Sequence, residues 1–202
     1  MTTAPPATLF GRLCSVLGLF VAIGLGFIAF TRLPPAPAPA ATGLVPAGGF
    51  STCDIAGGGY WRGSVHGGET LSFDWRDGAF ECDGNARPGD RGLRLFFAGR
   101  PGGSEHRLML VIGVSAALPA LQGAELPVNV TLIDEASSSF FHSSGDRCFA
   151  RFDEVAASRA PVEFRVAGEL YCAGSVPAVA GPGSVTLGDM AFAGRLALEP
   201  AP

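Results

Sequence analysis

The stretch from Arg147 to Cys172, RCFARFDEVAASRAPVEFRVAGELYC, decides the fold, because hydrophobic and polar residues alternate at both of its ends. A period of two is typical of strands, in which successive side chains point to opposite faces. The pattern predicts two strands, with EVAASRA (residues 154–160) as a short helical turn or a loop between them. The residues expected on the apolar face are Cys148, Ala150 and Phe152 in the first segment, and Val162, Phe164, Val166, Leu170 and Cys172 in the second.

The cysteines of this stretch are predicted to form a structural disulfide. Cys148 and Cys172 both fall on the apolar side of their strands and so point toward one core, while Cys53 and Cys82 supply a second pair. None of the four has the C-x-x-C spacing of a zinc site. An even set of four is typical of an oxidising compartment and allows three connectivities. We favour the two local pairings, 53–82 and 148–172.

Alternation of the same kind extends over the chain from about residue 50. TLSFDW (70–75) and VNVTLID (128–134) each place their apolar residues on one face, and RLMLVIGV (107–114) is apolar on both faces, as in a central strand covered on both sides. Glycine- and proline-rich turns separate these segments. The sequence therefore predicts an all-β domain, an antiparallel β-sandwich or Greek-key barrel of about eight to ten strands.

The last predicted strand, SVTLGDMAFAGRLAL (184–198), changes parity along its length. Val185 and Leu187 occupy odd positions, whereas the apolar residues from Met190 onward occupy even ones. An extra residue in one strand shifts the side chains that follow to the other face. We therefore expect a β-bulge near Gly188 and Asp189.

The N-terminal region predicts a membrane segment followed by a linker. Eighteen residues from Leu13 to Phe30 carry no charge, and Arg12 and Arg32 flank them. A helix of that length spans about 27 Å, close to the ~30 Å core of a bilayer. The Pro/Ala alternation that follows favours a semi-rigid polyproline II stalk. The expected organisation is a cytoplasmic segment (1–12), a signal anchor (13–31), a linker (32–50) and an extracytoplasmic β-domain (51–202). The alternative is a signal peptide that is cleaved, giving a secreted protein.

Charge excludes several classes of function. Beyond residue 50 the chain has twelve arginines against eighteen acidic residues, a net charge of −6, and no basic patch, so nucleic acid is not an expected partner. The whole chain has no lysine. Mechanisms that need a Schiff base, a P-loop lysine or a Ser–Lys pair are therefore excluded.

No motif predicts a catalytic, cofactor or metal site. The nucleophile patterns G-x-S-x-G and S-x-x-K are missing from the sequence. The three histidines, His66, His106 and His142, are far apart and are expected to be exposed near turns. His142 lies in SSSFFHSSGD beside serines and Asp146, yet triads converge from different elements rather than from sequence neighbours. The prediction is a non-enzyme, and the alternative is a hydrolase with an unrecognised site around His142 or Trp61.

A possible binding surface is predicted in GGGYWRG (57–63). Tyr60 and Trp61 stand beside glycines there, and aromatic rings on an open sheet stack on sugars or on partner proteins. Packing in the core or at its rim is the competing interpretation.

The order C-x-A-x-F, V-x-G-E-L-Y-C, G-x-V-T-L-x-x-M-x-F-x-G, between Cys148 and Gly194, resembles small bacterial envelope lipoproteins of the lipoprotein-antigen type. The chain departs from them in having no lipobox. The resemblance implies a secreted or surface β-domain and transfers no site residue. We therefore expect a binding or structural module of a bacterial envelope, tethered by its N-terminal helix, with another envelope protein or a glycan as partner.

Overall fold

The computed structural model describes residues 51–89, 91–102, 106–159 and 162–198. Nearly all of its regular structure is β-strand, with one short 3₁₀ turn, η1 (Leu118–Ala120). The strands are β1 (Tyr60–His66), β2 (Thr70–Arg76), β3 (Glu81–Ala86), β4 (Leu93–Gly99), β5 (Leu108–Val114), β6 (Glu125–Asp134), β7 (Ser139–Ala157), β8 (Glu163–Cys172), β9 (Val176–Pro177) and β10 (Ser184–Ala197).

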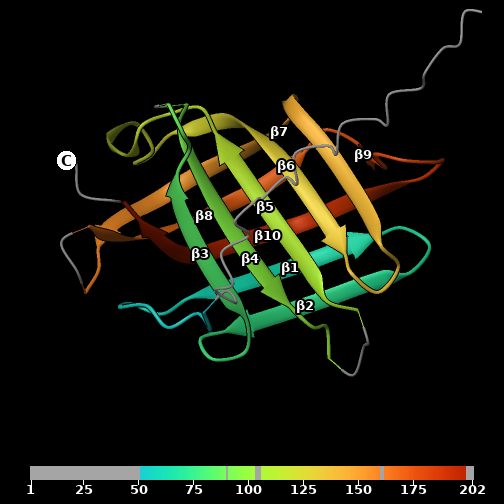
Figure 1. The fold of residues 1–202 in the computed structure, drawn as a ribbon, viewed down its shortest axis with the longest axis horizontal. Helices are drawn as coiled ribbons and strands as arrows, with labels where there is room; N and C mark the ends of the chain where they lie inside the picture. Colours follow the sequence, from blue (N-terminus) through green and yellow to red (C-terminus); the bar gives the residue numbers. More distant parts are fainter. Residues whose placement is uncertain (1–50, 90, 103–105, 160–161, 199–202) are drawn as a thin grey trace, which may run out of the picture. The chain divides into compact units, whose positions relative to one another are not determined.

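These strands form one antiparallel sheet that curls on itself (Figure 1). Their order is β2-β1-β10-β8-β7-β6-β5-β4-β3, and the short β9 pairs with β10. The two edge strands, β2 and β3, are joined by only residues 77–80, so the edges must come close at that corner. The all-β, antiparallel prediction of eight to ten strands is confirmed. The finer prediction of a β-sandwich or Greek-key barrel was wrong, because the described strands form one curled sheet. From β3 to β8 each strand pairs with the next in the chain, so this part is a meander without Greek-key crossovers.

The core lies inside the curl, where aromatic rings from distant strands meet. Trp61 on β1 is fully buried, and its ring centroid lies 4.7 Å from that of Phe73 on β2 and 6.0 Å from that of Phe97 on β4. Phe97 also lies 5.6 Å from Phe192 on β10. The backbone of β10 approaches β4 so closely that a Cβ on Gly194 would lie 2.6 Å from the Phe97 ring.

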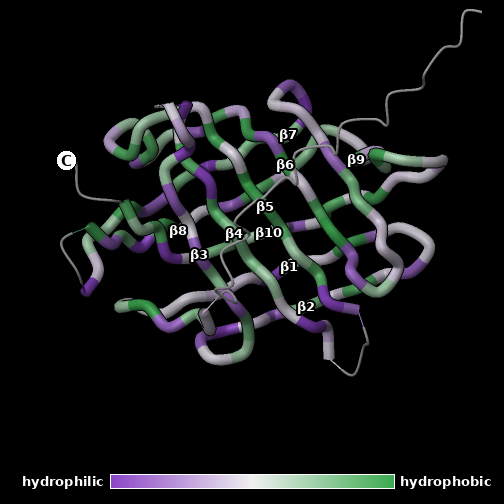
Figure 2. The backbone as a smooth tube through the Cα atoms, viewed as in Figure 1, coloured by the Kyte–Doolittle hydropathy of each residue, from purple (hydrophilic) through white to green (hydrophobic). Residues whose placement is uncertain are grey.

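The strand registers confirm the alternation predicted from sequence, as Figure 2 shows for hydropathy along the chain. On β5, Leu108, Leu110, Ile112 and Val114 are buried, and β6 buries Val128, Val130 and Leu132. The prediction that β5 is covered on both sides was wrong. Its second face, which carries Met109 and Val111, is only half-buried by the described part of the chain.

The long strands β10 and β7 each have one notable feature, a β-bulge in β10 and an extended C-terminal end in β7. The β1–β10 register shifts between Arg62 and Ser64, opposite Gly188 to Ala191, so β10 carries one extra residue there. Asp189 adopts a φ of 45° at this point, which confirms the predicted β-bulge. The helical turn or loop expected over 154–160 was wrong for residues 154–157. Strand β7 continues to Ala157 because Glu154 to Ala157 pair with Ala167 to Phe164 of β8.

Both predicted disulfides are present. Cys53 bonds to Cys82, and Cys148 bonds to Cys172, its direct cross-strand partner between β7 and β8. Two disulfides indicate that the domain matures in an oxidising compartment. The predicted signal anchor (13–31) and linker (32–50) lie outside the described residues. Within those residues no helix is long and apolar enough to cross a membrane.

Candidate functional site

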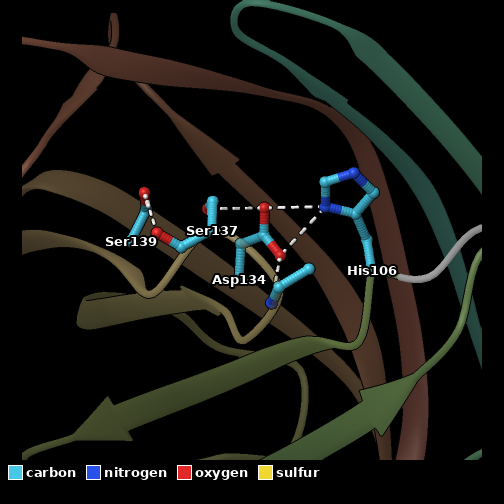
Figure 3. Close-up of polar contacts among 5 residues, drawn as sticks. His106, Asp134, Ser137 and Ser139 are labelled. Atoms are coloured by element: carbon cyan, nitrogen blue, oxygen red, sulfur yellow. Dashed lines mark hydrogen bonds and ion pairs between the residues drawn. The ribbon is translucent and has the colours of Figure 1, made fainter.

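A histidine and an aspartate that are distant in sequence meet at one end of the curled sheet. His106 directly precedes the short lead into β5, and Asp134 is the last residue of β6. Since β5 and β6 are antiparallel, with Leu108 opposite Asp134, the start of one strand lies beside the end of the other. His106 Nδ1 lies 2.9 Å from Oδ2 and 3.1 Å from Oδ1 of Asp134 (Figure 3).

The turn after β6 holds the Asp134 carboxylate in place. Ser137 Oγ donates a hydrogen bond of 2.8 Å to Oδ2, and the backbone N–H of Ala136 donates one of 3.1 Å to Oδ1. On the far side of this turn, Ser139 Oγ donates to the Ser137 carbonyl. Figure 3 shows the resulting line of contacts, in which the carboxylate lies between the serines and the histidine.

These contacts keep Asp134 ionised. Partial burial of the carboxylate raises its pKa, but hydrogen bonds from Ser137, His106 and the Ala136 amide, with the charge of His106, outweigh burial and lower the pKa below its ordinary value. Only 14% of the Asp134 side chain and 32% of the His106 side chain are exposed. The pair is therefore a fixed polar feature rather than a loose surface contact.

The pair borders a cleft of about 330 Å³, which we call the mouth cleft. The cleft lies where the β1–β2 hairpin, the start of β5, the β6–β7 turn and β10 come together. Its apolar lining reaches into the hydrophobic core and consists of Val65, Leu71, Leu108, Leu132, Phe141 and Val185. Polar groups at its border are Glu69, His106, Asp134, Ser137 and Ser139. An apolar cavity with a few convergent polar groups is the usual form of a small-ligand site.

A second depression continues the apolar surface beyond the mouth cleft. It shares Gly68, Ser139, Phe141 and Val185 with that cleft and reaches the β9–β10 turn. Phe140 is 50% exposed and Val179 66% exposed along it. Exposed apolar side chains grouped at one end of a domain favour contact with an apolar ligand or partner.

The geometry of the His106–Asp134 pair limits its chemistry. A carboxylate at Nδ1 favours the tautomer in which the neutral imidazole carries its proton on Nδ1. This is how an aspartate orients a general-base histidine in hydrolases. However, Ser137 donates its hydroxyl hydrogen to Asp134 and is not bonded to His106, so the three residues do not form a Ser–His–Asp triad.

The proposed aromatic surface of Tyr60 and Trp61 is corrected by the structure. Trp61 has no exposed surface, and its Nε1–H donates to the sulfur of Met190, so the core-packing interpretation is right for it. Tyr60 points to the other face of β1, where it is half-buried and the Arg62 guanidinium lies 5.4 Å from its ring centroid. Alternation along β1 separates the two rings.

The other histidines do not assemble a catalytic site within the described chain. His142 Nδ1 lies 3.0 Å from Thr131 Oγ1, its cross-strand partner, while the Asp146 carboxylate accepts a hydrogen bond from Ser144. His66 contacts Ser64 and Thr70. The hydrolase site expected around His142 or Trp61 is thus not brought together, and over the described ranges no group of three or more metal-ligating side chains occurs.

Sequence reasoning missed the His106–Asp134 pair, having placed His106 among exposed histidines near turns. The sequence did contain a signal for the pair, since His106 lies just before one apolar strand and Asp134 ends the next. It became informative only with the β5–β6 register, which brings residues 28 positions apart into contact. Comparison with family models, curated proteins and solved structures finds no match to this chain.

Proposed function

We propose that this chain is a membrane-tethered extracytoplasmic binding module of a bacterial cell envelope. The two disulfides carry the proposal, because paired cysteines persist in oxidising compartments and are rare in the cytosol. The uncharged run 13–30 supports a tether, and the Pro/Ala-rich linker that follows would hold the domain away from the bilayer.

The mouth cleft supports binding as the activity. Its lining is mostly apolar, and hydrogen bonds fix the His106–Asp134–Ser137 group on its border. A ligand that fits this arrangement has an apolar body and one polar end that reaches the His106–Asp134 pair. The cleft volume of about 330 Å³ suits a small ligand or a single large side chain of a partner.

Membrane fractionation tests the location. The full chain is expressed in a Gram-negative host, and membranes are washed with alkaline carbonate, which releases peripheral proteins. The proposal predicts that the protein stays in the pellet and that protease degrades its domain in spheroplasts but not in intact cells. Release into the periplasm would support cleavage of the segment, and protection in spheroplasts would contradict the extracytoplasmic location.

Fluorescence of N-phenyl-1-naphthylamine, a neutral apolar probe with one N–H group, tests the cleft. We expect the purified full chain to enhance the fluorescence of the probe, and we expect Leu71→Arg to reduce this enhancement because the charged side chain enters the apolar lining. Leu126→Arg is the matched control, since Leu126 is also half-buried on a strand but does not line the cleft. Equal enhancement by all three proteins would contradict binding in the cleft.

A hydrolase is the second candidate, because Asp134 orients His106 as a carboxylate orients a general base. The contacts of Ser137 argue against a hydrolase, since its hydroxyl donates to the Asp134 carboxylate and not to the His106 imidazole. Hydrolysis of p-nitrophenyl butyrate by the full chain, abolished by His106→Ala and by Asp134→Asn, would support the enzyme. A rate equal in the wild type and both variants would contradict it.

A further inference from the structure

The outer face of the sheet carries another depression, separate from the mouth cleft and from the depression that continues it. Antiparallel pairing places Arg62 of β1, Ala191 of β10 and Glu169 of β8 side by side in one row on this face. Alanine is short and its neighbours are long, so the row dips at Ala191. The result is a depression of about 330 Å³, whose border includes Arg62, Glu169, Tyr171 and Asp189. We call it the outer depression.

Two oppositely charged side chains on its border form no ion pair with other described residues. Glu169 pairs with Arg151 at 3.0 Å, but neither Arg62 nor Asp189 forms an ion pair or a side-chain hydrogen bond within that part of the chain. The Arg62 guanidinium is held over the Tyr60 ring instead. A ligand in the outer depression would therefore meet one unused cation and one unused carboxylate, with no net charge between them.

The β-bulge is what brings Asp189 to this border. Met190 pairs with Leu170, so the residue before it on β10 comes beside Tyr171, the residue after Leu170 on β8. Asp189 holds a φ of 45°, a conformation that side chains other than glycine, asparagine and aspartate seldom adopt. Such local strain is concentrated at functional positions.

Tyr171 provides a fixed aromatic surface. Its side chain is 45% exposed, and one side of its ring stacks on Phe149, with centroids 5.7 Å apart and an angle of 24° between the planes. A hydrogen bond with the Glu125 carboxylate raises the pKa of Tyr171. The Phe149 ring therefore supports one side of the Tyr171 ring, and less ordering of this side chain is left to occur on binding.

We infer that the outer depression binds a neutral glycan. Sugar hydroxyls both donate and accept, so one ring can donate to the Asp189 carboxylate and accept from the Arg62 guanidinium. The C–H face of a sugar packs on an aromatic ring such as that of Tyr171. An anionic or cationic ligand would satisfy only one of the two charges. The inference rests on the proposed extracytoplasmic location, where envelope glycans are accessible.

Isothermal titration with defined sugars tests the outer depression. The full chain is purified in lauryldimethylamine oxide, a detergent without a sugar headgroup, and titrated with maltohexaose, cellohexaose and chitohexaose. We expect at least one hexasaccharide to bind. Asp189→Asn keeps a side chain that tolerates positive φ and removes the charge, and Tyr171→Ala removes the ring. Each is expected to weaken binding about tenfold, whereas Arg76→Ala, an exposed cation on β2, leaves it unchanged.

The outcomes separate this inference from the proposed function. Asp189→Asn changes one polar atom, so its titration remains interpretable if Tyr171→Ala unfolds. Failure of all three sugars to bind, or equal affinity in wild type and Asp189→Asn, overturns the glycan site. If the purified proteins that fail to bind sugar still enhance the fluorescence of N-phenyl-1-naphthylamine, the proposed binding module is supported and only the glycan site is overturned. Binding of a mixed-charge Arg-Asp peptide in place of sugars likewise overturns the inference.

Discussion

Cys148 and Cys172 lie directly opposite one another on β7 and β8, with their sulfurs joined in a disulfide. Cys148 has no exposed surface, and Leu170, two residues before Cys172 on the same face of β8, is also buried. The bond therefore lies at the core side of the sheet and joins β7, which is 19 residues long, to its neighbour β8. Its role is structural.

Removing this disulfide should destabilise the domain. The bond closes a loop of 24 residues, and the chain-entropy relation gives a contribution of about 3–4 kcal/mol for a loop of that size. The variant Cys148→Ala/Cys172→Ala is expected to lose that much in free energy of unfolding, measured by urea titration of the purified full chain. Cys14→Ala is the control, because Cys14 lies outside the β-domain and forms no predicted pair. Equal midpoints for all three proteins would show that the bond contributes nothing to stability.

Gly194 is predicted to be essential for the close approach of β10 to β4. A Cβ at this position would lie 2.6 Å from the Phe97 ring, and Phe97 has no exposed surface and no room to move. Gly194→Ala should therefore cost about 1–3 kcal/mol through overpacking. Gly102→Ala should be near neutral, since a Cβ there meets nothing within 4 Å. Thermal unfolding of both variants checks this, and similar melting temperatures would contradict the packing described between these strands.

The Asp134 carboxylate should make stability depend on pH. Its pKa is lower in the folded state than in the unfolded state, so it stabilises the fold above the unfolded pKa of about 4, and this contribution is lost as pH falls through the folded value. Asp134→Asn is expected to lose about 1 kcal/mol at pH 7 and less at pH 3. Asp74→Asn, at an exposed position on β2, is the control. Urea titration at both pH values provides the measurement, and a difference that does not shrink at low pH would contradict a stabilising carboxylate.

The strands and disulfides could be predicted from sequence because both depend on local parity. Alternation of apolar residues identifies each strand face, and the cysteines fall on the buried face of theirs. Trp61 was harder, since an aromatic ring beside glycines fits a binding surface on an open sheet as well as the core. Only the curl, which brings Phe97 and Phe73 against its ring, shows that it belongs to the core.

The two candidate sites depend on how strands pair with one another, which the alternation of residues within a single strand does not predict. The meeting of His106 and Asp134 requires the β5–β6 register, and the outer depression requires the order β1-β10-β8. Arg165 illustrates the same limit. It lies on the polar side of β8 as expected, yet it is only 9% exposed because the loop before β1 covers it, and its guanidinium donates to the Gly58 carbonyl. The alternation of residues within β8 does not predict that the loop before β1 folds over Arg165.

The most direct test of the account is the redox state of the five cysteines in cells. The full chain is expressed in a Gram-negative host, denatured in acid to trap its thiols, and treated with a maleimide polymer before and after reduction. We predict one modified cysteine before reduction, Cys14, and five after reduction, because both pairs of the β-domain are oxidised. Modification of all five cysteines before reduction would place the domain in a reducing compartment and contradict the proposal of an extracytoplasmic module.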